Sequence, residues 1–408
     1  MLPAMTMTRR RALFVRVGLS LALACAAAGQ TQAQAQAKTK AKPKLSAKPG
    51  PAAKLSWQFA VGGDSRNCGD IVMPSVAAGS ASSHADFYWH LGDFRAIYDF
   101  DQDFLQQTER RGKKVSIADY QRAAWDDFIE SQLTPFAATP VFLGIGNHEL
   151  VPPKTRPDFL IQFADWFDAD PIRRQRLQDD PKDHRLKTWY HWVHGGIDFV
   201  NLDNASNDQL EPDQLRWFDG VIARAEANPE IQAIAVGMHA ALPDSLASGH
   251  SMNDWAQGEQ SGRGVYARLL KAHQKKPVYI FASHSRFYMS GIFETKEKRA
   301  AGDALPGWIV GTGGAVRYAL PAAASEAKEA RTNVYGYLVG AVGVAGAAPG
   351  EIRFEFHEIR EADVSAATLS RYGAQTVHEC FVGNSSATGE AAPALVAPAA
   401  SGSPSIRR

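Results

Sequence analysis

Short apolar runs alternate along this chain with longer segments of helical period, which is the pattern of an α/β fold. The runs expected to form buried strands are residues 57–61, 86–91, 141–145, 199–202, 234–237 and 278–282. Segment 211–227 places its apolar residues on one face and has Pro212 near its start, which predicts an amphipathic helix packed on a sheet. Apolar and polar residues alternate over 352–357, which predicts a half-exposed antiparallel strand and therefore a mixed sheet.

The two ends of the chain differ in composition from this body. Residues 1–37 have a basic segment, an apolar run and then small residues, which is the order of a signal peptide. Residues 38–55 form a Lys/Ala/Pro-rich linker and residues 383–408 a low-complexity tail, and neither contains enough large apolar residues to order itself. We therefore expect one globular domain over residues 56–382, with a disordered tail after it.

The amino-terminal segment predicts a periplasmic or secreted protein, but it leaves the export route open. Residues 8–14, with Arg9 and Arg10, resemble a twin-arginine signal, and the ordinary secretory route fits equally well. Cys25 after Leu23 and Ala24 also allows a lipoprotein cleavage site. The apolar run is short and contains Arg16, so no transmembrane segment is expected in the mature chain.

Composition excludes some classes of partner. The net charge is +1 and the sequence pI about 7.8, so no basic field indicates a nucleic acid. The hydrophobic fraction of 45% supplies enough material for a core. Cys68 and Cys380 would remain after signal cleavage, and the sequence allows either one disulfide between them or two free thiols.

Five of the predicted strands end in a residue that can ligate a metal. These residues are Asp64, Asp93, Asn147, His239 and His284. Ligands of open α/β sheets gather at the carboxyl ends of the strands, so side chains this far apart in sequence can converge. Glycines precede three of them and give the backbone room to turn. The pattern predicts a metal site.

The segments around these residues resemble the ordered blocks of the calcineurin-like metallophosphoesterases. The blocks are Gly63-Asp64-Ser65-Arg66, Gly92-Asp93, Gly146-Asn147-His148-Glu149, the isolated His239, and Ser283-His284-Ser285-Arg286. The resemblance covers residues 56–314 and ends in a glycine-rich strand, 308–314. It implies an α/β fold of four layers, an α-β-β-α sandwich with mixed sheets, around two adjacent metal ions.

The resemblance also implies roles for individual residues. Asp93 would bridge both metals, and Asn147, His239 and His284 would complete the second metal site. His148 would meet the substrate, either protonating the leaving oxygen or stabilising charge on the phosphoryl group. Carboxylate, amide and imidazole ligands suit a divalent Mn, Fe or Zn ion.

This sequence departs from the family pattern at the first metal site. Arg66 and Arg286 stand where the family has histidine ligands, and a guanidinium has no lone pair to offer a metal. We therefore expect one tightly bound ion, with the two arginines binding the phosphate of the substrate. Asp64 would ligate weakly or support the site, held by the arginines. Ala96 stands where the family has Asp or Asn, which matters less.

Other polar residues have simpler explanations. His184, His191 and His194 are expected in surface and packing roles, and His90 in packing. Asp99, Asp101 and Asp103 are expected in a solvated acidic loop. His250 lies in a polar loop from which it could reach the mouth of the site.

The expected function is hydrolysis of a small phosphate ester by a phosphomonoesterase or phosphodiesterase, with specificity residing in segment 156–192. The loss of two ligands leaves open a non-catalytic protein that binds a phosphate ligand on the same fold. A structural envelope protein would leave the set of Asn147, His148, His239 and His284 unexplained. The sequence does not indicate an oligomeric state.

Overall fold

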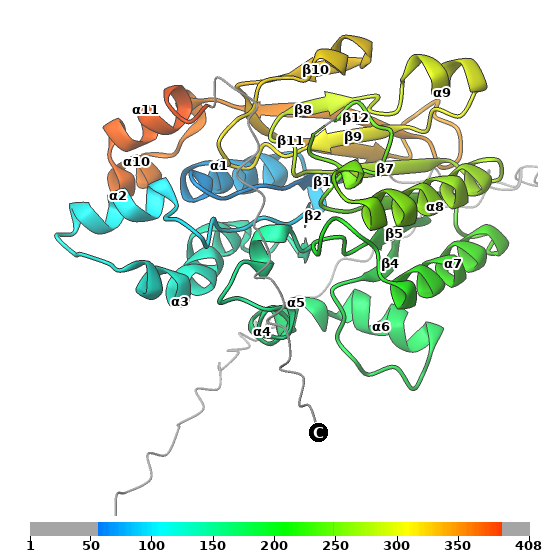
Figure 1. Cartoon of the computed structure of the whole chain (residues 1–408), viewed down its shortest axis with the longest axis horizontal. Helices are drawn as coiled ribbons and strands as arrows, with labels where there is room; N and C mark the ends of the chain where they lie inside the picture. The colour runs from blue at the N-terminus through cyan, green and yellow to red at the C-terminus, as the bar shows by residue number, and fades with distance from the viewer. Residues whose placement is uncertain (1–55, 248, 386–408) are drawn as a thin grey trace, which may run out of the picture. The chain divides into compact units, whose positions relative to one another are not determined.

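The computed structural model describes residues 56–247 and 249–385 (Figure 1). The predicted signal peptide and linker lie outside the described residues, and so does the predicted tail beyond Ser385. In the described part of the chain, no helix is long and apolar enough to cross a membrane.

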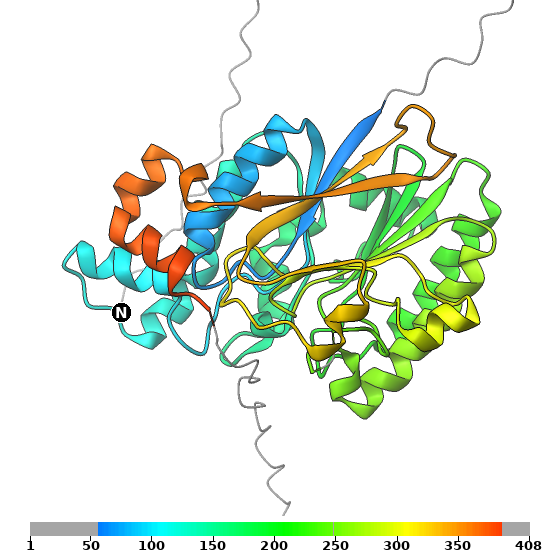
Figure 2. The same ribbon diagram turned by 90° about the horizontal axis from the view of Figure 1, so that it is seen from above.

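The first sheet combines strands from both ends of the domain. Its order is β12-β11-β1-β2-β3. The strands are β1 (Trp57–Gly62), β2 (Ala85–His90), β3 (Val141–Leu143), β11 (Tyr335–Val342) and β12 (Ile352–Ile359). Strands β1, β2 and β3 are parallel, whereas β11 runs antiparallel to both β1 and β12. Seen from above, β1 and the two late strands lie side by side (Figure 2).

The second sheet comes from the middle of the chain and has the order β10-β8-β9-β7-β6-β5-β4. The strands are β4 (Tyr190–His194), β5 (Ile197–Asn201), β6 (Ala233–Gly237), β7 (Val278–Ala282), β8 (Tyr288–Ser290), β9 (Gly307–Val310) and β10 (Glu329–Arg331). Its central strands β5, β6, β7 and β9 are parallel, and the outer ones are antiparallel. Both sheets are therefore mixed, as predicted.

Helices follow most of the parallel strands. The α-helices are α1 (Gly69–Ser82), α2 (Gln102–Arg110), α3 (Ile117–Phe128), α4 (Arg156–Gln162), α5 (Ala164–Phe167), α6 (Asp170–Asp179), α7 (Pro212–Ala227), α8 (Ala256–His273), α9 (Lys296–Ala301), α10 (Ala366–Tyr372) and α11 (Ala374–Val382). The short 3-10 or π turns are η1 (Ile129–Leu133), η2 (Thr134–Phe136), η3 (Asn147–Leu150), η4 (Met252–Asp254), η5 (Ala322–Glu326) and η6 (Glu361–Asp363).

Successive side chains of a strand point to opposite faces, so each sheet has one inner face. The inner faces of the two sheets pack against each other. Phe59 of β1 meets Phe199 of β5 edge to face, with ring centroids 5.1 Å apart. Trp89 of β2 donates a hydrogen bond of 3.0 Å to Asn201 of β5. One buried apolar cluster accordingly contains residues from both sheets.

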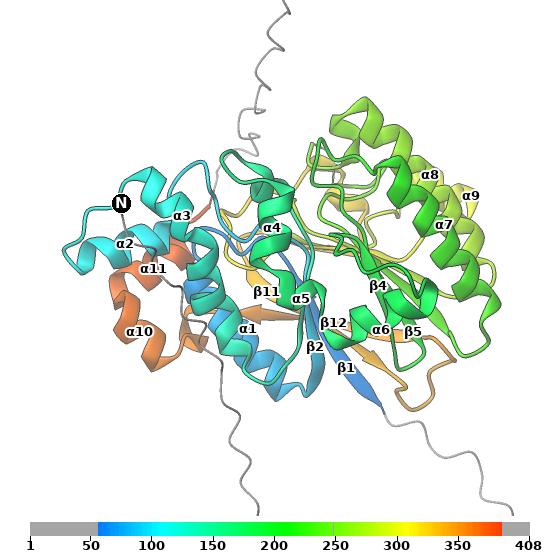
Figure 3. The same ribbon diagram turned by 90° about the horizontal axis from the view of Figure 1, so that it is seen from below.

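The outer face of each sheet is covered by helices. Ala60 and Tyr88 of the first sheet pack with Val72 and Val76 of α1. The outward residues of β6 and β7 pack with α7 and α8. Helix α1 lies on the opposite side of the domain from α7 and α8 (Figure 3). The four-layer α-β-β-α sandwich and the strands predicted from the apolar runs are thus confirmed.

A disulfide joins Cys68, at the start of α1, to Cys380 of α11. Both residues are fully buried. Beyond α11, the side chain of Asn384 donates hydrogen bonds to the carbonyl of Gly314 and the hydroxyl of Tyr335. The end of the domain is therefore attached next to the loop that follows β1, close to the candidate site.

Candidate active site

The predicted site residues lie at the carboxyl ends of neighbouring parallel strands. Asp64 follows β1, Asp93 follows β2, Asn147 follows β3, His239 follows β6 and His284 follows β7. The first three come from one sheet and the two histidines from the other. Packing the sheets face to face therefore brings five distant parts of the chain to one edge of the sandwich.

The backbone at three of these positions is left-handed. Asp64, Asp93 and His284 have φ values of 57°, 60° and 59°. Residues other than glycine rarely adopt this conformation, and each case costs about 1–3 kcal/mol. Gly146 is needed for a related reason, since a Cβ atom there would collide with the carboxylate of Asp93. The sharp turns that direct these side chains towards one point therefore lower the stability of the fold.

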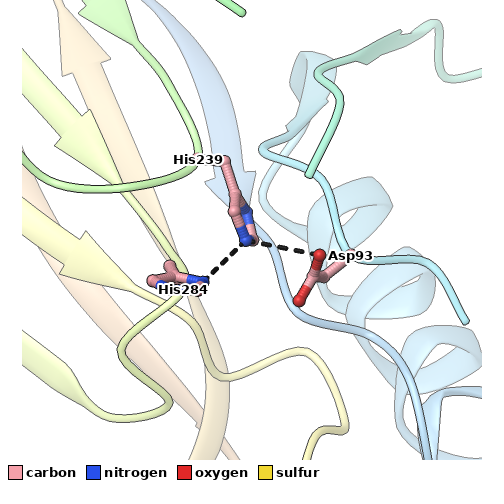
Figure 4. Close-up of side chains that lie close together, drawn as sticks. All are labelled: Asp93, His239 and His284. Atoms are coloured by element: carbon pink, nitrogen blue, oxygen red, sulfur yellow. Dashed lines mark hydrogen bonds and ion pairs between the residues drawn. The ribbon is translucent and has the colours of Figure 1, made fainter. Parts of the chain in front are cut away.

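Four side-chain atoms converge at the centre of the site. Nε2 of His239 lies 3.3 Å from Oδ1 of Asp93, 3.0 Å from Oδ1 of Asn147 and 3.0 Å from Nδ1 of His284. Ligand atoms of Asp93, His239 and His284 all lie within 4.8 Å of one another (Figure 4).

These atoms have the chemistry of a cation site. Nδ1 of His239 lies 3.0 Å from the carbonyl oxygen of Leu91, which can only accept, so that nitrogen carries the proton. Nε2 then presents its lone pair to a carboxylate, an amide oxygen and a second imidazole. Burial lowers the pKa of His239, but Asp93 outweighs it and the pKa stands at about 9. Without a metal, a proton therefore occupies Nε2, and a divalent ion would displace it. The residues fit one metal ion.

Asp64 lies beside this cluster. It is fully buried, and its Oδ2 accepts a 2.5 Å hydrogen bond from the backbone N–H of His284. Its Oδ1 has no hydrogen-bond partner among the described residues. Neither Arg66 nor Arg286 donates a hydrogen bond to it within that part of the chain, so the expected support from the arginines is not present as direct contacts. Asp64 instead fixes the turn that carries His284.

His148 faces Asp93 from η3. Its Nδ1 lies 2.7 Å from the carbonyl oxygen of Ala96 and therefore carries the proton, while Nε2 lies 3.7 Å from Oδ2 of Asp93. Burial, and next the positive charge of Arg66, lower the pKa of His148 to about 3. In the metal-free protein without substrate the ring is therefore neutral, with Nε2 unprotonated.

The two arginines are buried next to this cluster. Arg66 is 1% exposed and Arg286 8%. Nε of Arg66 lies 3.6 Å from Oδ2 of Asp93, beyond hydrogen-bond distance, and the guanidinium of Arg286 lies 4.0 Å from the ring centre of Tyr318. Burial, and then the charge of Arg66, lower the pKa of Arg286 to about 10. A second metal ion does not fit here, because two cations already occupy the positions of the expected ligands.

The profile of the calcineurin-like phosphoesterases matches residues 73–285, slightly more than half of the chain. The chain belongs to the calcineurin-like phosphoesterase family. This family comprises metal-dependent phosphoester hydrolases, which is therefore the class of this protein. The match includes Asp93, Asn147, His148, His239 and His284. The match begins after Arg66 and ends just before Arg286, so it excludes both substituted positions.

Two solved structures show a distant likeness. A structure titled PhoD is 13% identical with a TM-score of 0.45, and the match covers 82% of this chain and 78% of that one. A 5'-nucleotidase from Candida albicans SC5314 is 11% identical with a TM-score of 0.37, and the match covers 80% of this chain and 58% of that one. No curated protein matches the sequence significantly.

Glu149, the last residue of the family block around Asn147, had no predicted role. Its fully buried carboxylate accepts hydrogen bonds of 2.8–2.9 Å from the backbone N–H groups of Asp93, Phe94 and Gly146. Burial, and then the charge of Asp93, raise the pKa of Glu149 to about 8. One side chain thus ties together the two turns that carry Asp93 and Asn147. Its position within the conspicuous block was the only signal in the sequence.

Aromatic residues and one further histidine line the site. The ring of Tyr98 packs 5.2 Å from that of His148 and is 47% exposed. The ring of His250 lies 5.3 Å from His284 and stacks on Tyr318 at 4.9 Å. The expectation that His250 could reach the site is therefore confirmed, whereas nothing in the sequence singled out the two tyrosines.

The prediction that Asp101 and Asp103 lie in a solvated acidic loop is wrong. Both are fully buried, where they surround the equally buried Arg95 together with Asp70 and Asp127. Asp101 also accepts hydrogen bonds from the backbone N–H groups of Asn67 and Ala96. The cluster therefore fixes the loop that presents the Ala96 carbonyl to His148. The other expected non-ligands, His191 and His194, form hydrogen bonds with nearby aspartates away from the site.

Segment 156–192, which was expected to carry specificity, lines a cavity separate from the metal cluster. Its helices α4 to α6 precede β4 at the edge of the second sheet. A cavity of about 360 Å³ lies between this segment and α7, lined by residues that include Trp189, His191 and Trp217. None of the predicted site residues lines it.

Proposed function

We propose that this protein hydrolyses small phosphate esters with a single divalent ion, held by Asp93, Asn147, His239 and His284. The convergence of four lone-pair-bearing atoms on one point carries the proposal. The ion would be Mn, Fe or Zn, since the ligands combine hard oxygens with imidazole nitrogens. When bound, it supplies Lewis-acid activation of a phosphoryl oxygen and of water.

The remaining residues would bind and orient the substrate. Arg66 and Arg286 present guanidinium groups that match phosphate oxygens, and would take over the binding role of the missing ion. His148 is adjacent to both Arg66 and the exposed Tyr98, and would meet the leaving oxygen there. A bound phosphate dianion would offset the charge of Arg66, which favours a proton on Nε2 of His148 and hence donation to that oxygen.

The test is hydrolysis of an aryl phosphate and an aryl phosphodiester with added Mn. Turnover above that of a His239→Ala variant supports the proposal. The second candidate, a non-catalytic phosphate binder, is favoured by the loss of two histidine ligands. It would bind phosphate without turnover above the His239→Ala background.

Converting both arginines to histidines should raise metal uptake from one equivalent towards two. Arg66→His with Arg286→His restores two neutral ligands next to Asp64 and Asp93, whose buried carboxylates favour a cation. Elemental analysis of purified protein gives the metal-to-chain ratio. The matched control is Arg122→His with Arg216→His, two exposed arginines in surface pairs with aspartates. Two equivalents in the unmodified protein, or one in the double variant, would show that the arginines do not replace a metal.

We also propose that the protein acts in the periplasm or outside the cell after removal of residues up to about Ala37. The order of basic, apolar and small residues supports this, and so does the disulfide between Cys68 and Cys380, since disulfides persist in oxidising compartments. Amino-terminal sequencing of exported protein should begin near residue 38. An exported chain that begins at Met1 would contradict the proposal.

A further inference from the structure

The buried arginines have more hydrogen-bond donors than acceptors. Nε and Nη2 of Arg66 and Nε of Arg286 are buried without a hydrogen-bond partner in the described part of the chain. The other contacts of Arg66 are long, at 3.5 Å to Tyr98 and 3.5 Å to Nδ1 of His148, which already directs its proton to Ala96. Buried guanidiniums with unsatisfied donors are unfavourable unless an anion accepts their hydrogen bonds.

With an ion bound, the site would contain three cationic groups. They are the ion site at His239, the guanidinium of Arg66 and that of Arg286. The two guanidiniums cancel the charges of Asp64 and Asp93, so a divalent ion leaves the site with a net charge of +2. A phosphate monoester is mainly a dianion at neutral pH and has three terminal oxygens, one for each cationic group. A diester is a monoanion with two terminal oxygens.

The walls of the site favour a single ester substituent. On the Arg286 side, Tyr318 is 4% exposed and carries the stacked ring of His250. On the His148 side, Tyr98 is 47% exposed. A leaving group can extend past Tyr98, whereas a second substituent would point at Arg286 and Tyr318.

We propose that the site selects phosphate monoesters over diesters. Arg66 and Arg286 would each hold one terminal oxygen of a monoester while the third faces the ion, and a diester has one terminal oxygen too few for all three. This rests on the proposed function for the ion site. A diester would leave a buried guanidinium without its acceptor. Sites built around a hydrogen bond discriminate strongly against ligands that cannot form it, so we expect a preference of about a hundredfold or more.

The test compares two ligands that differ by one methyl group. Phenylphosphonate has three terminal oxygens and is not hydrolysed, whereas its monomethyl ester has two. Titration calorimetry of Mn-loaded protein at pH 8 should show about a hundredfold tighter binding of the phosphonate. Arg286→Gln should weaken binding of the phosphonate at least tenfold more than binding of the ester, and Arg286→Lys should restore part of the difference. Arg263→Gln, which changes an exposed arginine paired with Asp244, is the control.

The kinetic counterpart is the ratio of kcat/KM for p-nitrophenyl phosphate to that for bis(p-nitrophenyl) phosphate, expected to exceed about a hundred. Equal binding of the two phosphonate ligands by the unmodified protein would overturn the monoester inference, even if both nitrophenyl esters were hydrolysed. Selective phosphonate binding without turnover would overturn the proposed hydrolysis and leave the selectivity standing. The two failures are therefore distinguishable.

Discussion

Replacing His239 with alanine should remove the bound metal and with it the hydrolysis of aryl phosphates. Nε2 of His239 is the atom at which the other three proposed ligands meet, at 3.0–3.3 Å. Loss of a residue that merely supports a ligand typically weakens metal binding about 10–100-fold, and loss of a ligand itself should exceed that. Elemental analysis after dialysis and turnover with p-nitrophenyl phosphate measure the two effects.

His194→Ala is the matched control for this experiment. His194 is 40% exposed at its side chain and pairs with Asp86 on the surface, so its loss should leave metal content and turnover unchanged. A His239→Ala protein that keeps a full equivalent of metal would show that the ion binds elsewhere. Unmodified protein with no more turnover than this variant would favour the non-catalytic phosphate binder.

His148→Ala should lower turnover by about two to four orders of magnitude while leaving the metal in place. The Nε2 atom of His148 lies 3.7 Å from Asp93, and only its backbone N–H, which alanine retains, donates a hydrogen bond to that carboxylate. The side chain is therefore free to act on the leaving oxygen. Turnover and metal content are measured on the same sample.

The metal content decides the interpretation of that variant. If His148→Ala loses its metal, then His148 helps to hold the ion, and the division of roles between it and Asn147 is wrong. If turnover falls less than tenfold with metal retained, the proton on the leaving oxygen must come from another residue or from water.

The metal cluster could be predicted from the sequence because its members share a local signal. Asp93 and Asn147 follow glycines at the ends of apolar runs, and His239 and His284 follow runs of the same kind. Where a strand ends is a local property, and the carboxyl ends of parallel strands meet by the geometry of the sheet. The four layers were predicted from the resemblance to the family, and the helix at α7 from its one-sided apolar pattern and Pro212.

The supporting contacts could not be predicted, because they depend on packing between distant segments. Arg95 lies amid four carboxylates, and two of them, Asp101 and Asp103, were predicted from the sequence to be solvated. The pairing of Cys68 with Cys380 depends on where α11 lies against α1. Tyr318 reaches the site only through the fold of the chain after β9, for which no motif gave a signal.

The position of β1 in the middle of its sheet affects how the chain can fold during synthesis. One neighbour, β2, follows it within a short stretch of sequence, but the other, β11, is synthesised only after β2 to β10. Contacts between such distant segments form slowly, and an unpaired strand edge invites pairing with other chains. The first sheet is therefore completed only after all strands of the second sheet have been synthesised. A chain interrupted anywhere before Tyr335 would be left with an aggregation-prone edge.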